Sequence, residues 1–222
     1  MSNNDSFVEE VSEAVRRDRL FATFRKYGWI AGLVVIAIVG GAAWSEYTKA
    51  RDAAEAEALG DALLVANEAD DAEERAAALT QVEADGGARA VAGMLSAGAL
   101  EEAGDAAAAA QLLRDLSSAA DVPPLYRDLA ALKAVMVDPD MPPEEKVNAL
   151  DSLAQPGAPF QLLAKEQQAY AQVAAGDRET ALGTLRSIVD DAGVSQGLRD
   201  RAQTLIVALG GDVTDGGAAP EE

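Results

Sequence analysis

The sequence predicts an all-α protein in which a single N-terminal transmembrane helix is followed by an α-solenoid. Residues 27–45 form a run of apolar and small polar residues without one charge. Beyond this run, stretches of good helix formers alternate regularly with turn clusters rich in Gly, Asp and Pro. No alternating run of Val, Ile and Tyr appears, so strands are not expected. Each predicted element is justified below in chain order.

Residues 1–26 are predicted to form a basic amphipathic tail. Ser6 and Glu9 have the spacing of a capping box at a helix start. Apolar side chains recur on one face of the predicted helix, namely those of Phe7, Val11, Ala14 and Phe21. An interfacial helix near anionic headgroups is one interpretation, and a frayed tail that only supplies topogenic charge is the other.

Residues 27–45 are predicted to be the transmembrane helix. At about 1.5 Å per residue, such a helix is roughly 28 Å long, close to the ~30 Å of a hydrocarbon core. Aromatic residues flank it on both sides and are expected to anchor it at the two interfaces, namely Tyr27, Trp29, Trp44 and Tyr47. A cleaved signal peptide, with small residues at 41–43, and a buried core helix are the alternatives.

The orientation of the span follows from the basic residues beside it. Five precede the span, and only Lys49 and Arg51 follow it closely. The positive-inside rule therefore predicts a cytoplasmic N-terminus and places residues 46–222 across the membrane. Acids and bases balance up to Ser45, so the net charge of −20 belongs to this outer part. Its acidity reflects either a basic partner or the demands of solubility and habitat.

Composition argues against most chemistry. The chain contains no His and no Cys, which removes the usual general base, the thiol nucleophile and most zinc ligands. The acidic clusters fall where helices begin or turns form, and capping explains them without a metal. A charge of −20 disfavours nucleic acid. We therefore expect no enzyme activity, cofactor, metal, nucleic acid or small-molecule substrate, although an enzyme with an unrecognised site is a further alternative.

An internal repeat organises residues 46–209. When the sequence is shifted by 72 positions, Gly104 and Asp105 fall on Gly176 and Asp177. Each Gly suits the residue that ends a helix, and each Asp suits the N-cap of the next helix. Four helix hairpins are expected near 51–84, 87–118, 125–154 and 159–191, followed by a capping helix at 195–209. Residues 210–222 are predicted to be a disordered acidic tail.

The period of the repeat, about half of 72 residues, resembles that of the tetratricopeptide repeat. Small residues followed by large apolar residues at helical spacing carry the resemblance, best in "QAYAQVAAGDRETALGTLRSIVDD". The Trp and Leu-Gly of that family's first helix are missing, and an irregular helical bundle is the alternative. The repeat register predicts that Ala109, Ala149 and Ala181 lie where paired helices touch.

Four residues of the predicted first helices of hairpins are candidates for partner binding: Tyr126, Arg127, Gln167 and Tyr170. Repeat modules that bind a peptide's terminal carboxylate line their groove with Lys, Arg and Asn, but many acids lie among the basic residues here, so a carboxylate clamp is not expected. Core packing is the alternative role of Tyr126 and Tyr170.

The chain consists of a basic tail, one span and an alanine-rich acidic repeat domain, joined through "VRRDRLFATFRKYGWIAGLVVIAIVGGAAW". This layout resembles that of the YfgM-like family of bacterial inner-membrane proteins. This resemblance implies a non-catalytic scaffold at the periplasmic exit of the Sec translocon. It also implies, as protein partners, translocon subunits and a membrane-anchored prolyl isomerase chaperone. The alternative is an anchored repeat protein of cytochrome c maturation or of other envelope assembly.

Overall fold

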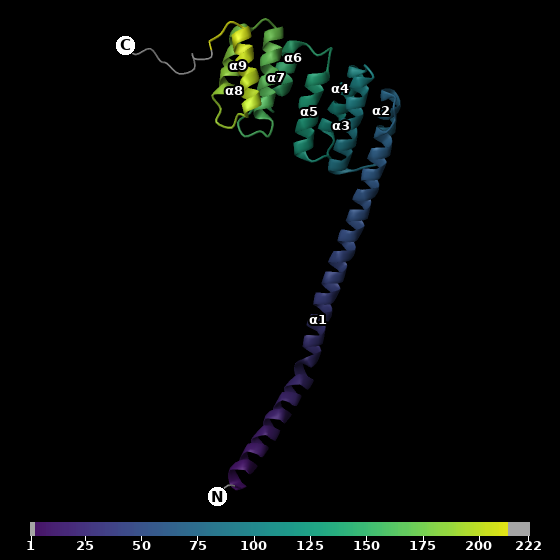
Figure 1. Ribbon diagram of the computed structural model, residues 1–222, viewed down its shortest axis with the longest axis vertical. Coiled ribbons are helices and arrows are strands. Elements are labelled where there is room, and N and C mark those ends of the chain that lie inside the picture. The colour runs from purple at the N-terminus through teal and green to yellow at the C-terminus, as the bar shows by residue number, and fades with distance from the viewer. Residues whose placement is uncertain (1–2, 213–222) are drawn as a thin grey trace, which may run out of the picture. The chain divides into compact units, whose positions relative to one another are not determined.

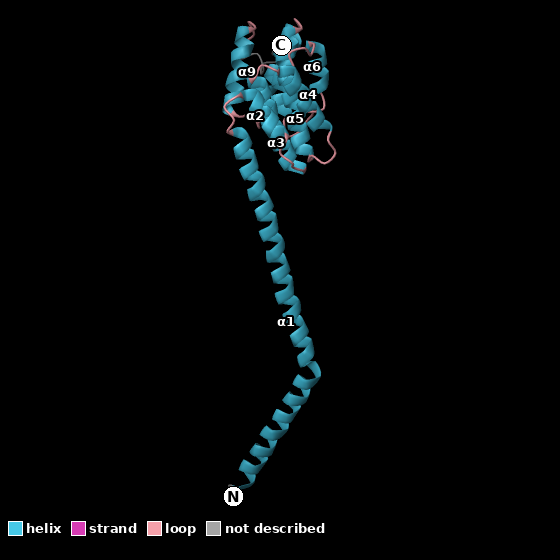
Figure 2. Cartoon of the chain, turned by 90° about the vertical axis from the view of Figure 1, so that its right-hand side faces the viewer, coloured by secondary structure: helices cyan, strands magenta, loops and turns pink. Residues whose placement is uncertain are grey.

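The protein is all-helical wherever its structure is described. The computed structural model describes residues 3–212, with side chains from Arg25 onward except at 27, 28 and 31. Within this part the cartoon shows helices joined by loops and no strand (Figure 2). The helices are α1 (Asn3–Asn67), α2 (Ala72–Thr80), α3 (Gly86–Glu102), α4 (Ala106–Ser118), α5 (Pro124–Val137), α6 (Pro143–Leu150), α7 (Gln161–Ala174), α8 (Arg178–Val189) and α9 (Gln196–Ala208). The all-α prediction is confirmed for the described residues.

The chain divides into two compact units within α1, the first ending at Ala58 and the second beginning at Leu59. The predicted boundary between span and repeat domain, at 45 and 46, stays a prediction. Side chains of the predicted basic tail up to residue 24, and the predicted disordered tail from residue 213 onward, lie outside the described residues.

No helix of the part that the structure describes combines the length and the apolarity that crossing a membrane requires.

Helices α2 to α9 succeed one another along the second unit in chain order (Figure 1). Four hydrophobic clusters lie along this series, and each is built by helices that are neighbours in sequence. Leu113 of α4, for example, packs with α3 and α5, and Leu185 of α8 packs with α7 and α9. Such a row of small cores, in place of one central core, is consistent with an α-solenoid.

Alanine supplies more than half of the buried apolar residues, including Ala97, Ala109, Ala169 and Ala181, which are all fully buried. A short side chain fills little volume, so it stays buried only where helices approach closely.

The turns between paired helices repeat as the sequence predicts. Gly104 and Gly176 have φ of +86° and +82°, a conformation that glycine adopts without strain. After them, the N–H groups of Asp105 and Asp177 donate to carbonyls five residues back, at 2.8 and 2.9 Å. The same motif ends α9 at Gly210 (φ +70°). This Schellman geometry satisfies carbonyls that a helix end would leave unpaired.

One part of the predicted register is wrong. Ala109 and Ala181 are fully buried, but Ala149 is exposed. The buried residues here are Leu150, which ends the short helix α6, and Leu153 in the turn after it, and they correspond to Leu185 and Ile188 of α8. The sequence pattern Ala-Leu-x-x-Leu begins in both helices, but it is displaced by three residues in α6. The cause is the start of α6, where Pro142 and Pro143 replace the Gly-Asp turn and reset the helix.

Candidate functional site

Exposed apolar side chains of the second unit lie on every other helix. Seven large apolar residues of α2 to α9 are strongly exposed, namely Val91, Leu95, Leu125, Met136, Leu163, Tyr170 and Val207. All belong to α3, α5, α7 and α9, the first helices of the hairpins and the capping helix. Within the described residues, α2, α4, α6 and α8 carry none. Leu64 and Val65 extend the set to the end of α1, which precedes α2 as the first helix of its pair.

This distribution identifies the odd-numbered helices as the candidate interaction surface. Helix α3 packs against α5 as well as against α4, so successive odd-numbered helices are neighbours at this point of the series. Apolar side chains held in water on one set of helices are a common mark of a protein-binding surface.

Two of the predicted partner-binding residues, Tyr126 and Arg127, lie in the first turn of α5. Tyr126 is half-buried against the cluster of α3, α4 and α5, and its ring lies beside Gly87, where a Cβ would come within 3.2 Å of Cε2. The proposed alternative role of Tyr126, core packing, accounts for this placement. Arg127 is half-buried, and among the described residues it forms no ion pair.

The other two, Gln167 and Tyr170, lie one turn apart on α7. Tyr170 is 43% exposed and borders an open hollow of about 340 Å³ between α7 and α9. Helix α9 supplies the remaining lining residues, which are Asp200, Arg201, Thr204, Leu205 and Ala208. Gln167 is half-buried and outside this lining. No hydrogen bond or ion pair within the described part joins the residues of α5 to those of α7.

An ion pair between a buried carboxylate and a half-exposed guanidinium lies at one wall of this hollow. Glu166 of α7 is only 4% exposed, and Arg201 of α9 donates to both its carboxylate oxygens, from Nε at 2.7 Å and Nη2 at 2.8 Å. This hydrogen bonding and the charge of Glu166 raise the pKa of Arg201. A two-point bond of this kind restricts the relative position of two helices more tightly than a single contact does.

Sequence reasoning missed Glu166 and Arg201, although one signal was present. Leu162, Glu166, Ala169 and Val173 are spaced by four, three and four residues, which places them on one face of a helix. The other three are apolar. A single carboxylate on an otherwise apolar face indicates a buried charge that needs a partner. Sequence alone does not show which of the several arginines supplies it.

The chemistry of the hollow is that of recognition. It offers a phenol, a carboxylate, a hydroxyl and two apolar side chains, in an open depression. Tyr and Arg beside apolar side chains are typical of interface hot spots. Among residues 25–212, the described acidic side chains form no cluster that could hold a metal ion.

The predicted membrane anchors lie on α1. Trp29, Trp44 and Tyr47 are 65%, 71% and 66% exposed, and the rings of Trp44 and Tyr47 are 6.4 Å apart. The side chain of Tyr27 lies outside the described residues.

No protein-family model, no curated protein sequence and no solved structure matches this chain significantly.

Proposed function

We propose that the protein is a non-catalytic, membrane-anchored scaffold that binds protein partners through the odd-numbered helices of a tetratricopeptide-repeat-like domain. The observation that carries the proposal is the confinement of the exposed large apolar side chains of α2 to α9 to α3, α5, α7 and α9. Chance exposure would distribute such residues over all helices. A surface that binds successive stretches of a partner would need them on the same helix of each hairpin.

The membrane anchor is supported by the first unit. Leu33, Val34, Val35 and Ile36 are consecutive and all more than half exposed. Consecutive helical residues point in directions about 100° apart, so these four side chains surround the helix. A single partner helix would cover one side only, whereas lipid covers every side. The charge-free run of the sequence has the length of a span.

The cellular setting we propose is the periplasmic face of the bacterial inner membrane, beside the Sec translocon and a membrane-anchored prolyl isomerase chaperone. Its support is the layout of the sequence, in which a basic tail, one span and an acidic repeat domain follow one another as in the YfgM-like family. Tethering to one bilayer raises the effective concentration of other membrane partners, so weak contacts on the odd-numbered helices suffice for docking.

The anchor is tested by topology. Alkaline phosphatase fused after Glu222 should be active, and Val35→Arg should reduce the membrane-bound fraction, because an arginine at mid-span costs about 2.5–3.5 kcal/mol on insertion scales. Glu57→Arg, outside the run, is the control. An inactive fusion, or equal membrane fractions in both variants, would contradict the anchor.

Partner binding is tested with the full chain in mild detergent. Co-purified proteins should include translocon or chaperone subunits, and Leu95→Ser with Leu163→Ser should release them. Gln111→Ser with Glu179→Ser, at exposed positions of α4 and α8, is the matched control and should retain them. Capture of haem-maturation proteins alone would overturn the Sec assignment but leave the scaffold in place. Equal retention by both double variants would overturn the surface.

A further inference from the structure

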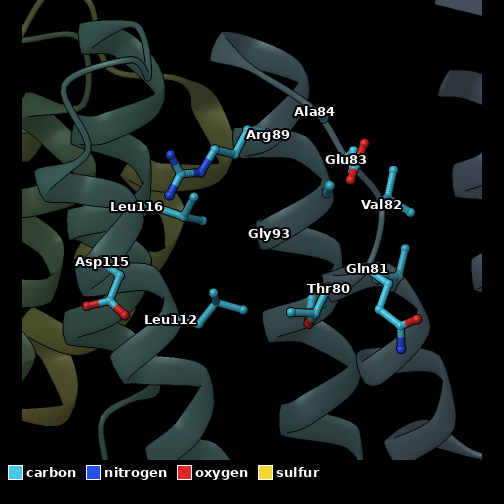
Figure 3. Close-up of a pocket in the computed structure, with 13 residues that line it drawn as sticks. Thr80, Gln81, Val82, Glu83, Ala84, Arg89, Gly93, Leu112, Asp115 and Leu116 are labelled. Carbon is cyan, nitrogen blue, oxygen red and sulfur yellow. The ribbon is translucent and has the colours of Figure 1, made fainter.

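A second depression lies on the even-numbered helices of the second unit. It has a volume of about 350 Å³ and lies between α2 and α4, with α3 as its floor (Figure 3). Leu112 and Leu116 of α4 project toward Gly93 of α3, opposite the end of α2. The one buried polar side chain of the floor, Ser96, is already satisfied, because its hydroxyl donates to the Ala76 carbonyl at 3.0 Å. The floor is therefore suited to apolar groups.

The depression exists because α2 ends early. Helix α2 has 9 residues where α4 has 13, a difference of about one turn. Residues 81–85 then lead directly to α3, so the surface that another turn of α2 would cover is left open.

The second half of the repeat fills the corresponding place with its own residues. Helix α6, 72 positions after α2, is equally short, but the connection after it runs over 151–160 and packs Leu153 and Phe160 against α5 and α7. Gly93 corresponds to Lys165, and Asp115 corresponds to Ser187. Lys165 donates from Nζ to Ser187 Oγ at 3.3 Å, so an ammonium group reaches across from α7 to α8.

In the first half Leu116 packs over Gly93, where a Cβ would come within 2.6 Å of Leu116 Cδ1, so no side chain reaches across from this position. Asp115 takes the place that Ser187 has in the second half. Asp115 accepts a hydrogen bond from the amide of Gln111 at 2.8 Å, and neither Asp115 nor Glu83 has an ion-pair partner among the described residues. Arg89, the one cation of the lining, is bound to both carboxylate oxygens of Asp121 at 2.9 and 3.0 Å. The rim is therefore complementary to positive charge.

The rim also presents free backbone. Glu83 and Ala84 lie in a stretch without helix, turn or bend, and in the described part of the chain their N–H and C=O groups form no hydrogen bond. Unpaired backbone N–H and C=O groups can pair with the backbone of an extended peptide, as the free edge of a sheet does.

We propose that this depression docks an extended segment of a partner protein in which a lysine or arginine lies between apolar residues. The basic side chain pairs with Asp115 at the rim, the position that corresponds to Ser187, the partner of Lys165 in the other half. The flanking apolar side chains cover Leu112 and Leu116, and the segment's backbone pairs with Glu83 and Ala84. The site is distinct from the exposed apolar side chains of the odd-numbered helices, although α3 forms its floor, and it does not depend on the membrane or translocon part of the proposed function.

The probe is a fluorescein-labelled octapeptide of alternating valine and lysine, titrated into the full chain in mild detergent. Binding should raise the fluorescence anisotropy and slow hydrogen exchange at the amides of residues 83 and 84. The same peptide with glutamate in place of lysine should bind at least tenfold more weakly. Exchange that slows only at α7 and α9 would overturn the proposal.

Two matched variants distinguish binding at this site from general electrostatic attraction of the basic peptide to an acidic protein. Asp115→Ser recreates the residue of the second half and should weaken binding at least fivefold. Glu179→Ser is the control, because Glu179 is an exposed acid on α8, the helix of the second half that corresponds to α4, and lies outside the lining of the depression. Its affinity should stay within twofold of the unchanged chain. Equal losses in the two variants would overturn the proposal.

Discussion

The α3–α4 hairpin and the α7–α8 hairpin share their turns but differ on their surfaces. Both have glycine at positive φ, an aspartate N-cap, and a fully buried alanine and leucine at the same positions of the second helix. Their first helices diverge, since α3 borders an open depression through Gly93 whereas α7 carries the buried Glu166. The residues that form each hairpin are thus the same in both halves, whereas the residues that face other helices or a partner differ between them.

The largest expected effect concerns the leucines at the centre of each hairpin. Leu113 and Leu185 are both fully buried, so Leu113→Ala and Leu185→Ala should each lower the free energy of unfolding by about 2–5 kcal/mol. Urea unfolding of the full chain, followed by circular dichroism, measures both. Leu95→Ala, at an exposed position of α3, is the control. Losses that differ by more than twofold between Leu113 and Leu185 would break the equivalence of the two hairpins.

The second largest loss of stability should occur only in the half that contains α7 and α8, at the ion pair of Glu166 and Arg201. Arg201→Met leaves the buried carboxylate of Glu166 without its partner. Loss of one partner of a fully buried pair costs about 3–5 kcal/mol, and half exposure of Arg201 reduces the expected loss to about 2–3 kcal/mol. Arg89→Met removes an arginine from the exposed carboxylate of Asp121 and should change the unfolding midpoint little. Arg201→Met with Glu166→Gln should recover part of the loss, and no recovery would contradict a pairing role.

Overpacking should distinguish the buried repeat positions Ala109 and Ala181 from Ala149, which the sequence pattern assigned wrongly. Ala109→Leu and Ala181→Leu place extra methyl groups at closely packed, fully buried positions and should cost about 1–3 kcal/mol each. Ala149→Leu, at an exposed position, should stay within about 0.5 kcal/mol of the original chain. A large loss at Ala149 would restore the register that the sequence pattern predicts.

The repeat register shows which features can be predicted from sequence and which cannot. Gly104 and Gly176 were predictable because a backbone conformation selects the residue type directly. Ala149 was mispredicted because Ala and Leu recur throughout the chain, so a five-residue pattern of them does not define a helix face. The helix start at Pro142 and Pro143 changes which residues of α6 face its neighbours. Only the positions of the neighbouring helices reveal this change.

The candidate sites were predictable to a smaller extent for the same physical reason. Tyr170 was a candidate for partner binding, with core packing as the alternative. Its neighbour Arg201 lies 31 positions later and meets it only through the packing of α9 on α7 and α8. The depression beside Gly93 arises from a missing turn in α2, and no residue of the sequence marks the early end of that helix.

Glycine substitutions should test the shared turns more gently. Gly104→Ala and Gly176→Ala force a side chain into the left-handed region and should each cost about 1–2 kcal/mol. Gly183→Ala, inside α8 with open space around it, should instead stabilise by about 0.5–1 kcal/mol. The three variants are compared by their urea midpoints at constant slope. A gain at Gly104 or Gly176 would contradict the helix-ending role assigned to both.

The smallest expected effect is the pH dependence of the Asp177 cap. Asp177 accepts from both the side chain and the backbone N–H of Thr180, and these hydrogen bonds lower its pKa. A carboxyl whose pKa is lower in the folded state contributes stability that is fully present above its unfolded pKa of about 3.9 and is lost as pH falls through the folded value.

Asn caps a helix about as well as Asp but does not titrate in this range. The advantage of the original chain over Asp177→Asn should therefore shrink as the pH falls from about 5 to the acid limit of folding. Urea midpoints of both chains, measured from pH 7 downward, give this advantage at each pH. An advantage that stays constant with pH would show that the hydrogen bonds from Thr180 do not favour the charged form of the carboxylate.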